Sequence, residues 1–235
     1  MTARILTAVL LSTCLFAGGK RLSFDQAQGE SPFNYASLNI INWLPNENSY
    51  ITKKGNSLLK VDIMKSDTTV LLTEADFKIK DNNLLISKGK VEQAPWRSAF
   101  TPKTFWFNNA GNKILFIVDR KKIWRRSFFA SFYVIDLRTK NIQPVSKNNK
   151  RLRNAKFSPD GNKIAYIRED NNIYVYDLNR NKEKQLTSNG SDVISNGHFG
   201  WVYEEEFGSF DAYRWSPDSR YIAYWEEDQS QVPIF

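Results

Sequence analysis

Few residues in this sequence could form disulfides or metal centres: its 235 residues include one cysteine, one histidine, 11 glycines and 8 prolines. A single cysteine excludes an intramolecular disulfide, and one histidine with one cysteine excludes a zinc cluster of such ligands. The low glycine and proline counts exclude collagen-like and low-complexity chains. Hydrophobic residues, by contrast, make up 41% of the chain and aromatic residues 14%. The chain is therefore globular, and its length suffices for one large all-β domain or one to two ordinary domains.

The charge of the chain is positive but not clustered. Its 33 lysines and arginines exceed its 25 aspartates and glutamates, which gives a formal net charge of +8. Clustered cations would indicate binding to nucleic acid. Here the cations are scattered through asparagine-rich turns such as 146–153 and 179–184, while the last third carries acidic runs at 204–206 and 226–228. We therefore expect a solvated surface and no nucleic-acid partner.

Residues 1–19 have the composition of a secretory signal peptide. One cation is followed by the apolar run 5–17 and then by small residues, with a cleavage site after Ala17 or Gly19. A run of 13 apolar residues is too short to span a bilayer. The sequence therefore predicts an exported protein, periplasmic or secreted. Cys14 lies in a segment that loosely resembles a bacterial lipobox, which leaves a lipoprotein or membrane-attached form as the alternative.

Four segments share one pattern: an aromatic residue, a turn and an apolar strand. They are Trp43–Ile51, Phe107–Leu115, Phe157–Ala165 and Trp215–Ala223. Their turns contain Pro, Asn, Asp or Gly, which favour tight turns, so each segment predicts a β-hairpin. A second hairpin is expected in the first three repeats, where a strand ends at an aspartate and the chain returns nine residues later. The aspartates are Asp62, Asp136 and Asp177, and the returns are at Leu71, Val145 and Leu186.

The spacing of these markers predicts the repeat of a β-propeller. The aromatic residue precedes the aspartate by 19, 29 and 20 residues, and the shortest complete unit has 41 residues. This length matches the roughly 40–50 residues of a four-stranded propeller blade. We therefore predict an all-β fold, an incomplete β-propeller over residues 43–235 with about three four-stranded blades and the start of a fourth. Residues 20–42 form a lead-in segment, and a β-sandwich is the alternative fold.

Two stretches exceed the 41-residue unit and are candidates for a functional site, because propellers tend to carry function on insertions. The first insertion, 124–131, contains an arginine between aromatic residues. The second, 197–210, contains three adjacent glutamates, flanked by apolar residues that predict one or two helical turns. A third stretch that exceeds the unit contains residues 78–90, and its sequence predicts only an extra strand and loop.

The glutamates and the arginine offer complementary chemistry. On a short helix, Glu205 and Glu206 lie about 100° apart, so both carboxylates can converge on one ammonium group. An exposed acidic patch is the alternative, and no histidine or aspartate at a suitable spacing indicates a metal site. Arg125 carries a fork of donors suited to a carbonyl or carboxylate. Its alternative is a surface arginine stacked on neighbouring aromatic residues.

Taken in order, these motifs resemble the dipeptidyl peptidase IV-type serine peptidases of the prolyl oligopeptidase superfamily. The resemblance is carried by Trp124-Arg125-x-Ser127-x-x-Ala130-Ser131, Trp201-Val202-Tyr203-Glu204-Glu205-Glu206, Trp215-Ser216-Pro217 and Gln231-Val232-Pro233. It runs from about Trp43 to the C-terminus. The resemblance implies that the chain is the N-terminal propeller of such a peptidase.

The resemblance also implies roles for single residues. Glu205 and Glu206 would bind the free α-amino group of a peptide and Arg125 a substrate carbonyl, so that cleavage follows the second residue, Pro or Ala. Glu204 would be structural. The nucleophile would belong to an α/β-hydrolase domain of the same full-length protein, on a Gly-x-Ser-x-Gly elbow. That pattern does not occur in these 235 residues, and the single histidine, His198, therefore has no nucleophile elbow to serve as a base.

We therefore expect the substrate-anchoring part of an exported, serine-type dipeptidyl aminopeptidase. This chain alone would have no catalytic residues, no metal or cofactor and no hydrolytic activity. Its partners would be a peptide N-terminus and the hydrolase domain, and a homodimer of the full-length form is open. The alternative is a non-enzymatic propeller that serves as a binding module of the periplasm or cell surface.

Overall fold

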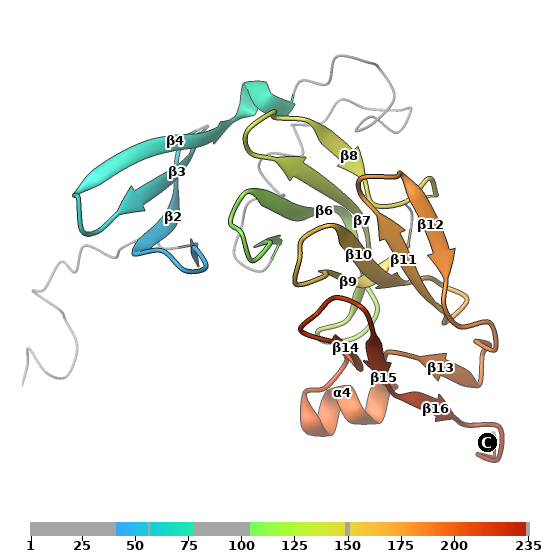
Figure 1. Ribbon diagram of the computed structural model, residues 1–235. Coiled ribbons are helices and arrows are strands. Elements are labelled where there is room, and N and C mark those ends of the chain that lie inside the picture. The colour runs from blue at the N-terminus through green and yellow to red at the C-terminus, as the bar shows by residue number, and fades with distance from the viewer. Residues whose placement is uncertain (1–40, 56, 78–103, 149–150, 234–235) are drawn as a thin grey trace, which may run out of the picture. The chain divides into compact units, whose positions relative to one another are not determined.

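The computed structural model describes residues 41–55, 57–77, 104–148 and 151–233. The expected signal peptide at 1–19, nearly all of the lead-in segment and the extra strand expected at 78–90 lie outside the described residues. Antiparallel strands dominate the described chain (Figure 1).

Three four-stranded antiparallel sheets follow one another along the chain, and each is a meander in which sequence neighbours pair. The first comprises β1 (Asn42–Trp43), β2 (Ser49–Lys54), β3 (Ser57–Asp62) and β4 (Asp67–Thr73). The second comprises β5 (Phe105–Phe107), β6 (Lys113–Lys122), β7 (Phe128–Asp136) and β8 (Ile142–Pro144). The third comprises β9 (Arg153–Phe157), β10 (Lys163–Ile167), β11 (Ile173–Asp177) and β12 (Lys182–Gln185). These sheets are the predicted blades.

A fourth group of strands is smaller. In it, β13 (Ile194–Asn196) pairs with β16 (Glu226–Asp228), and β14 (Tyr213–Trp215) pairs with β15 (Ile222–Tyr224). The described chain is thus a partial β-propeller of three blades and the first strands of a fourth, as predicted.

The sequence markers occupy equivalent places in each blade. The aromatic residue of the repeat is the last residue of β1, β5, β9 and β14, and the shared aspartate is the last residue of β3, β7 and β11. Asp136 shows why an aspartate is needed, because its Oδ1 accepts the N–H groups of Arg138 and Thr139 at 3.0 and 2.8 Å. Asp62 and Asp177 likewise accept the N–H groups of the residues two and three positions ahead of them.

The returning strands begin and end slightly differently from the prediction. β4 begins at Asp67, four residues before Leu71, and β8 and β12 end one residue before Val145 and Leu186. The difference is one of boundaries, because the Val145 N–H still donates to Phe132 O at 3.0 Å and the Leu186 N–H to Ile173 O at 2.8 Å. Pairing therefore continues by one hydrogen bond beyond the strand.

Alternating side chains bury both faces of the inner blades. In β6, Ile114 and Phe116 belong to the core shared with the first blade, while Leu115 and Ile117 belong to the core shared with the third. In β10, the same alternation places Ala165 in the core next to β14. Blade packs on blade through these apolar layers, which is the packing that a propeller requires.

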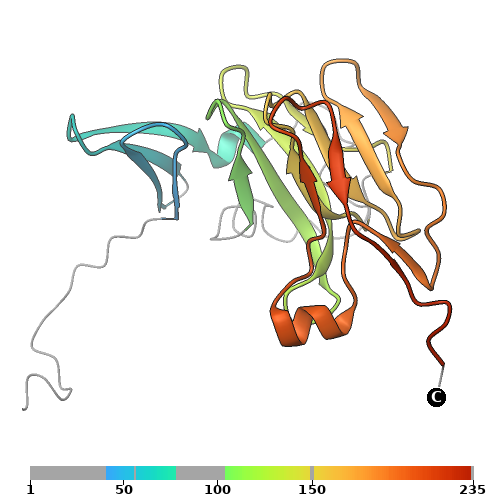
Figure 2. The same ribbon diagram turned by 60° about the horizontal axis from the view of Figure 1, so that its bottom comes forward.

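Helices are few in the described chain. There is one 3₁₀ turn, η1 (Glu74–Phe77), and one α-helix, α4 (Trp201–Phe207), which lies at the end of the β6–β7 hairpin (Figure 2). The helix confirms the short helical insertion expected around the glutamates. Among the described residues, no helix is long and apolar enough to cross a membrane.

Candidate functional site

The first insertion lengthens a hairpin. β6 and β7 contain ten and nine residues, whereas the corresponding strands β10 and β11 contain five each. The added residues make this hairpin longer than that of the third blade. At its tip, the Ile123 N–H donates to Ser127 O at 3.0 Å and closes the turn. Arg125 lies in this tip. The extra residues were predicted correctly as an insertion, but their place in longer strands was not predicted.

The second insertion forms α4. The helix follows Gly200, whose N–H donates to a carboxylate oxygen of Glu227 at 3.1 Å, and it ends at Gly208. Gly208 has a φ of 65°, and its N–H closes the last turn on Glu204 O at 3.0 Å. The Arg126 guanidinium donates to Gly208 O at 3.3 Å, so a cation from the hairpin tip lies at the negative end of the helix.

The two insertions meet through an ion pair. Nη2 of Arg125 lies 3.0 Å from Oε2 of Glu205, with the arginine side chain 69% exposed and the glutamate side chain 16% exposed. Glu206, the next residue of α4, is exposed, and no ion pair joins it to another described residue. The structure therefore brings the Arg125 guanidinium to the Glu205 carboxylate, and the exposed Glu206 is the next residue of the same helix. The predicted stacking alternative for Arg125 is not what the structure has: arginines 120, 151 and 153 lie over Phe128 and Phe129 instead.

Glu204 points the other way and is fully buried. Its Oε1 accepts the backbone N–H groups of Arg126 and Ser127, the latter at 2.9 Å. Burial alone would raise the pKa of Glu204, but the hydrogen bonds from Ser127 and Arg126 and the charge of Arg153 outweigh it, and the pKa is lowered. This carboxylate is therefore ionised at neutral pH inside the protein.

Arg153 balances that charge from β9. The residue is 3% exposed, and burial lowers the pKa of its guanidinium to about 10, although the nearby Glu204 carboxylate acts to raise it. Arg153 was not predicted as a site residue, because it lies in an ordinary blade strand and no local pattern sets it apart. The contact between Gly200 and the Glu227 carboxylate was not predicted either.

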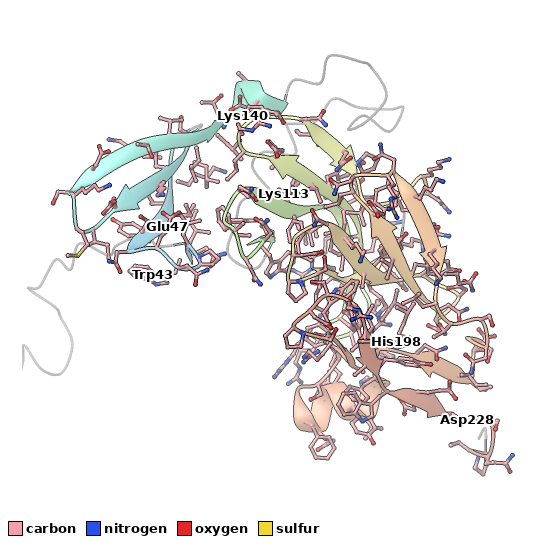
Figure 3. All side chains as sticks on the ribbon, in the orientation of Figure 1. Trp43, Glu47, Lys113, Lys140, His198 and Asp228 are labelled. Carbon is pink, nitrogen blue, oxygen red and sulfur yellow. The ribbon has the colours of Figure 1, made fainter. Side chains whose placement is uncertain are left out.

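His198 is a packed residue of the fold. It is 5% exposed and lies among crowded side chains, whereas Asp228 lies at an edge (Figure 3). Its Nε2 lies 2.8 Å from Oδ1 of Asn171, whose amide nitrogen donates to Ser191 O at 2.8 Å, so the imidazole donates here. Burial and then the charge of Arg153 lower the pKa of His198 to about 4. The ring is therefore neutral at ordinary pH.

The helix α4 also exposes aromatic side chains. Trp201, Tyr203 and Phe207 are 55%, 42% and 72% exposed. Tyr203 stacks on Phe199 with ring centroids 4.7 Å apart. The helix that carries the glutamates therefore exposes apolar surface as well as charge. Within the part of the chain that the structure describes, no group of three or more potential ligands is placed to hold a metal ion.

Comparisons with known proteins identify one family. The model of the family described as "Dipeptidyl peptidase IV (DPP IV) N-terminal region" matches residues 108–235. Dipeptidyl-aminopeptidase B of Aspergillus niger is 31% identical over 185 residues, 77% of this chain and 20% of that protein. Dipeptidyl peptidase 4 of Trichophyton rubrum is 28% identical over 222 residues, 93% of this chain and 26% of that protein.

A solved structure agrees with the sequence relatives. The crystal structure of Porphyromonas gingivalis dipeptidyl peptidase 4 matches with a TM-score of 0.68 and 25% identity, over 83% of this chain and 26% of that chain. The present chain spans about a quarter or less of the length of each of these three proteins. By its family match, its relatives and its fold, the chain belongs to the dipeptidyl peptidase IV family, of which it contains the N-terminal region.

Proposed function

We propose that this chain is the substrate-anchoring propeller of an exported dipeptidyl aminopeptidase. Glu205 and Glu206 bind the free α-amino group of a peptide, and Arg125 binds a carbonyl of the same peptide. The observation that carries the proposal is the 3.0 Å approach of Arg125 to Glu205, which brings residues of two separate insertions to one surface. Family membership supports the same assignment.

The chemistry of the site suits an ammonium group better than a metal ion. An α-ammonium group has three N–H donors, and each charge-assisted hydrogen bond contributes about 1.5–3 kcal/mol when partly desolvated. Glu206 is exposed and Glu205 is one residue away on the same helix, so both carboxylates can serve one ligand. The Arg125–Glu205 pair is exposed on the arginine side, and such pairs contribute little, about 0–1 kcal/mol. The guanidinium can therefore exchange its partner for a peptide carbonyl at small cost.

Fixing the amino group determines how far a peptide extends from the propeller. A hydrolase domain in the same full-length protein would then cut after the second residue, with Pro or Ala there, and would supply the nucleophile, base and acid. The propeller provides binding energy and orientation. These lower the activation barrier of peptide hydrolysis only by holding the peptide in the geometry that the reaction needs. On this proposal the chain alone binds peptide N-termini and hydrolyses nothing, and residues 1–19 direct it out of the cytoplasm.

The test is a titration of the 235-residue chain with the dipeptide amide Ala-Pro-NH₂, followed by tryptophan fluorescence or NMR. We expect Glu205→Gln and Glu206→Gln each to weaken binding about tenfold, because each removes one charge-assisted contact. Glu47→Gln is the matched control, since it removes a carboxylate ion-paired with Lys60 in the first blade. Unchanged affinity in both site variants would contradict the proposal and favour a binding module of another kind.

A further inference from the structure

The carboxylate next to the proposed amine-binding pair holds the hairpin tip against the helix. Glu204 is 0% exposed, and Ser127, one of its two N–H donors, is also fully buried. The other donor is the N–H of Arg126, whose side chain also reaches Gly208 O at the end of the helix. Arg126 is thus fixed to α4 by its backbone and by its side chain.

This attachment sets the register between the two halves of the site. Arg125 immediately precedes Arg126 in the tip, and Glu205 immediately follows Glu204 in the helix. Because Glu204 binds the backbone at 126 and 127, the neighbouring residues 125 and 205 are brought opposite each other, where their ion pair is observed. On a free loop, the arginine side chain would have no fixed distance from the carboxylates of α4.

Charge balance makes the attachment hard to replace. The carboxylate of Glu204 is removed from water, and its charge is offset by two backbone donors and by the nearby guanidinium of Arg153, which is itself 3% exposed. A buried charge of this kind is stable only with its partners in place, so the tip and the helix are held as one unit.

We propose that Glu204 is the positioning residue of the site: it fixes the distance between the arginine that binds a carbonyl and the carboxylates that bind an amine. This inference rests on the proposed function for the identity of the ligand. It assigns Glu204 no contact with the peptide. Its effect is on ligands that must reach both halves of the site at once.

The experiment compares two ligands on the 235-residue chain. Ala-Pro-NH₂ spans both halves, whereas n-butylamine offers only the amine. In Glu204→Ala we expect affinity for the dipeptide amide to fall about tenfold and affinity for n-butylamine to change less than about twofold. Amide hydrogen exchange at Arg126 and Ser127 should accelerate at least about tenfold, because the acceptor of both N–H groups is gone.

Two further variants keep the test decisive. Glu204→Gln retains an oxygen that can accept both N–H groups, and it should lose less than about threefold in dipeptide affinity even where the alanine variant folds poorly. Asp177→Ala is the matched control, since Asp177 accepts two backbone N–H groups in a turn of the third blade. It should leave both ligands unaffected.

The contradicting results are distinct. In Glu204→Ala, an equal loss of both ligands, unchanged dipeptide affinity, or unchanged exchange at 126 and 127 would each overturn the positioning role. Failure of the wild-type chain to prefer Ala-Pro-NH₂ over its N-acetylated form would instead contradict the proposed function. In that case exchange at 126 and 127 still decides whether Glu204 orders the tip, and a positioning role toward peptides would be wrong.

Discussion

Arg125 and Glu205 form an ion pair between a hairpin tip and a seven-residue helix that are far apart in the sequence. The pair joins the two insertions that the repeat spacing identified as candidate sites. Elsewhere in the blades, the side chains mainly form the cores between sheets. A contact of this kind has little value for stability, because the arginine is 69% exposed. The pair does, however, bring residues of two separate insertions into contact.

Replacing Arg125 should separate binding from folding. In Arg125→Gln we expect the free energy of unfolding to change by less than about 0.5 kcal/mol, since an exposed ion pair contributes little. Affinity for Ala-Pro-NH₂ should nevertheless fall several-fold, because the neutral amide is a weaker donor to a carbonyl. Urea denaturation and a ligand titration measure the two quantities. A variant that loses stability and keeps affinity would show that the arginine is structural.

The stability of the chain should fall on mild acidification because of His198. Its pKa in the folded chain is lowered to about 4 from an ordinary 6.5, so the unfolded state binds the proton first as the pH falls. Above pH 6.5 the neutral ring makes its full contribution to the free energy of unfolding, about 3 kcal/mol. This contribution is lost as the pH falls toward about 4.

The measurement is urea denaturation at several pH values on the wild type and on His198→Gln, which does not titrate. The variant should show a flatter dependence of unfolding free energy on pH across this window. Parallel curves for the two proteins would mean that His198 is not the group responsible.

Replacing Gly208 at the end of α4 should destabilise the chain. It has a φ of 65°, and an added Cβ would collide with the guanidinium of Arg126, which donates to the Gly208 carbonyl. Gly208→Ala should therefore lower the unfolding free energy by about 1 kcal/mol for the left-handed backbone, and by more as Arg126 is displaced. Gly55→Ala is the matched control, because Gly55 has a φ of 57° but no atom within 4 Å of a new Cβ. Equal losses in the two variants would show that Arg126 is not displaced.

The repeat could be predicted from the sequence because it depends on local chemistry. Asp136 binds N–H groups two and three residues ahead, so an aspartate at the end of a strand is a signal that needs no tertiary contact. Trp215 likewise ends its strand and precedes a turn, as the sequence pattern indicated. The spacing of such markers was enough to identify blades.

The interior of the site could not be predicted in the same way. Glu204 could only be assigned a structural role by resemblance, because its partners are backbone N–H groups of the hairpin tip, which any sequence provides. Arg153 lies on a strand of the next blade, and its contribution depends on the packing of blade against blade. The one-to-one register of 125 with 205 follows from those tertiary contacts, so only a structure reveals it.

The binding of a free amino group by Glu205 and Glu206 is tested most directly by a cycle that changes both the protein and the ligand. The wild-type chain and the double variant Glu205→Gln, Glu206→Gln are titrated with Ala-Pro-NH₂ and with its N-acetylated form. We predict that the wild type binds the free amine at least about tenfold more tightly and that the double variant does not distinguish the two ligands. Equal affinity of the wild-type chain for both ligands, or an undiminished preference in the double variant, would contradict the amine-binding role.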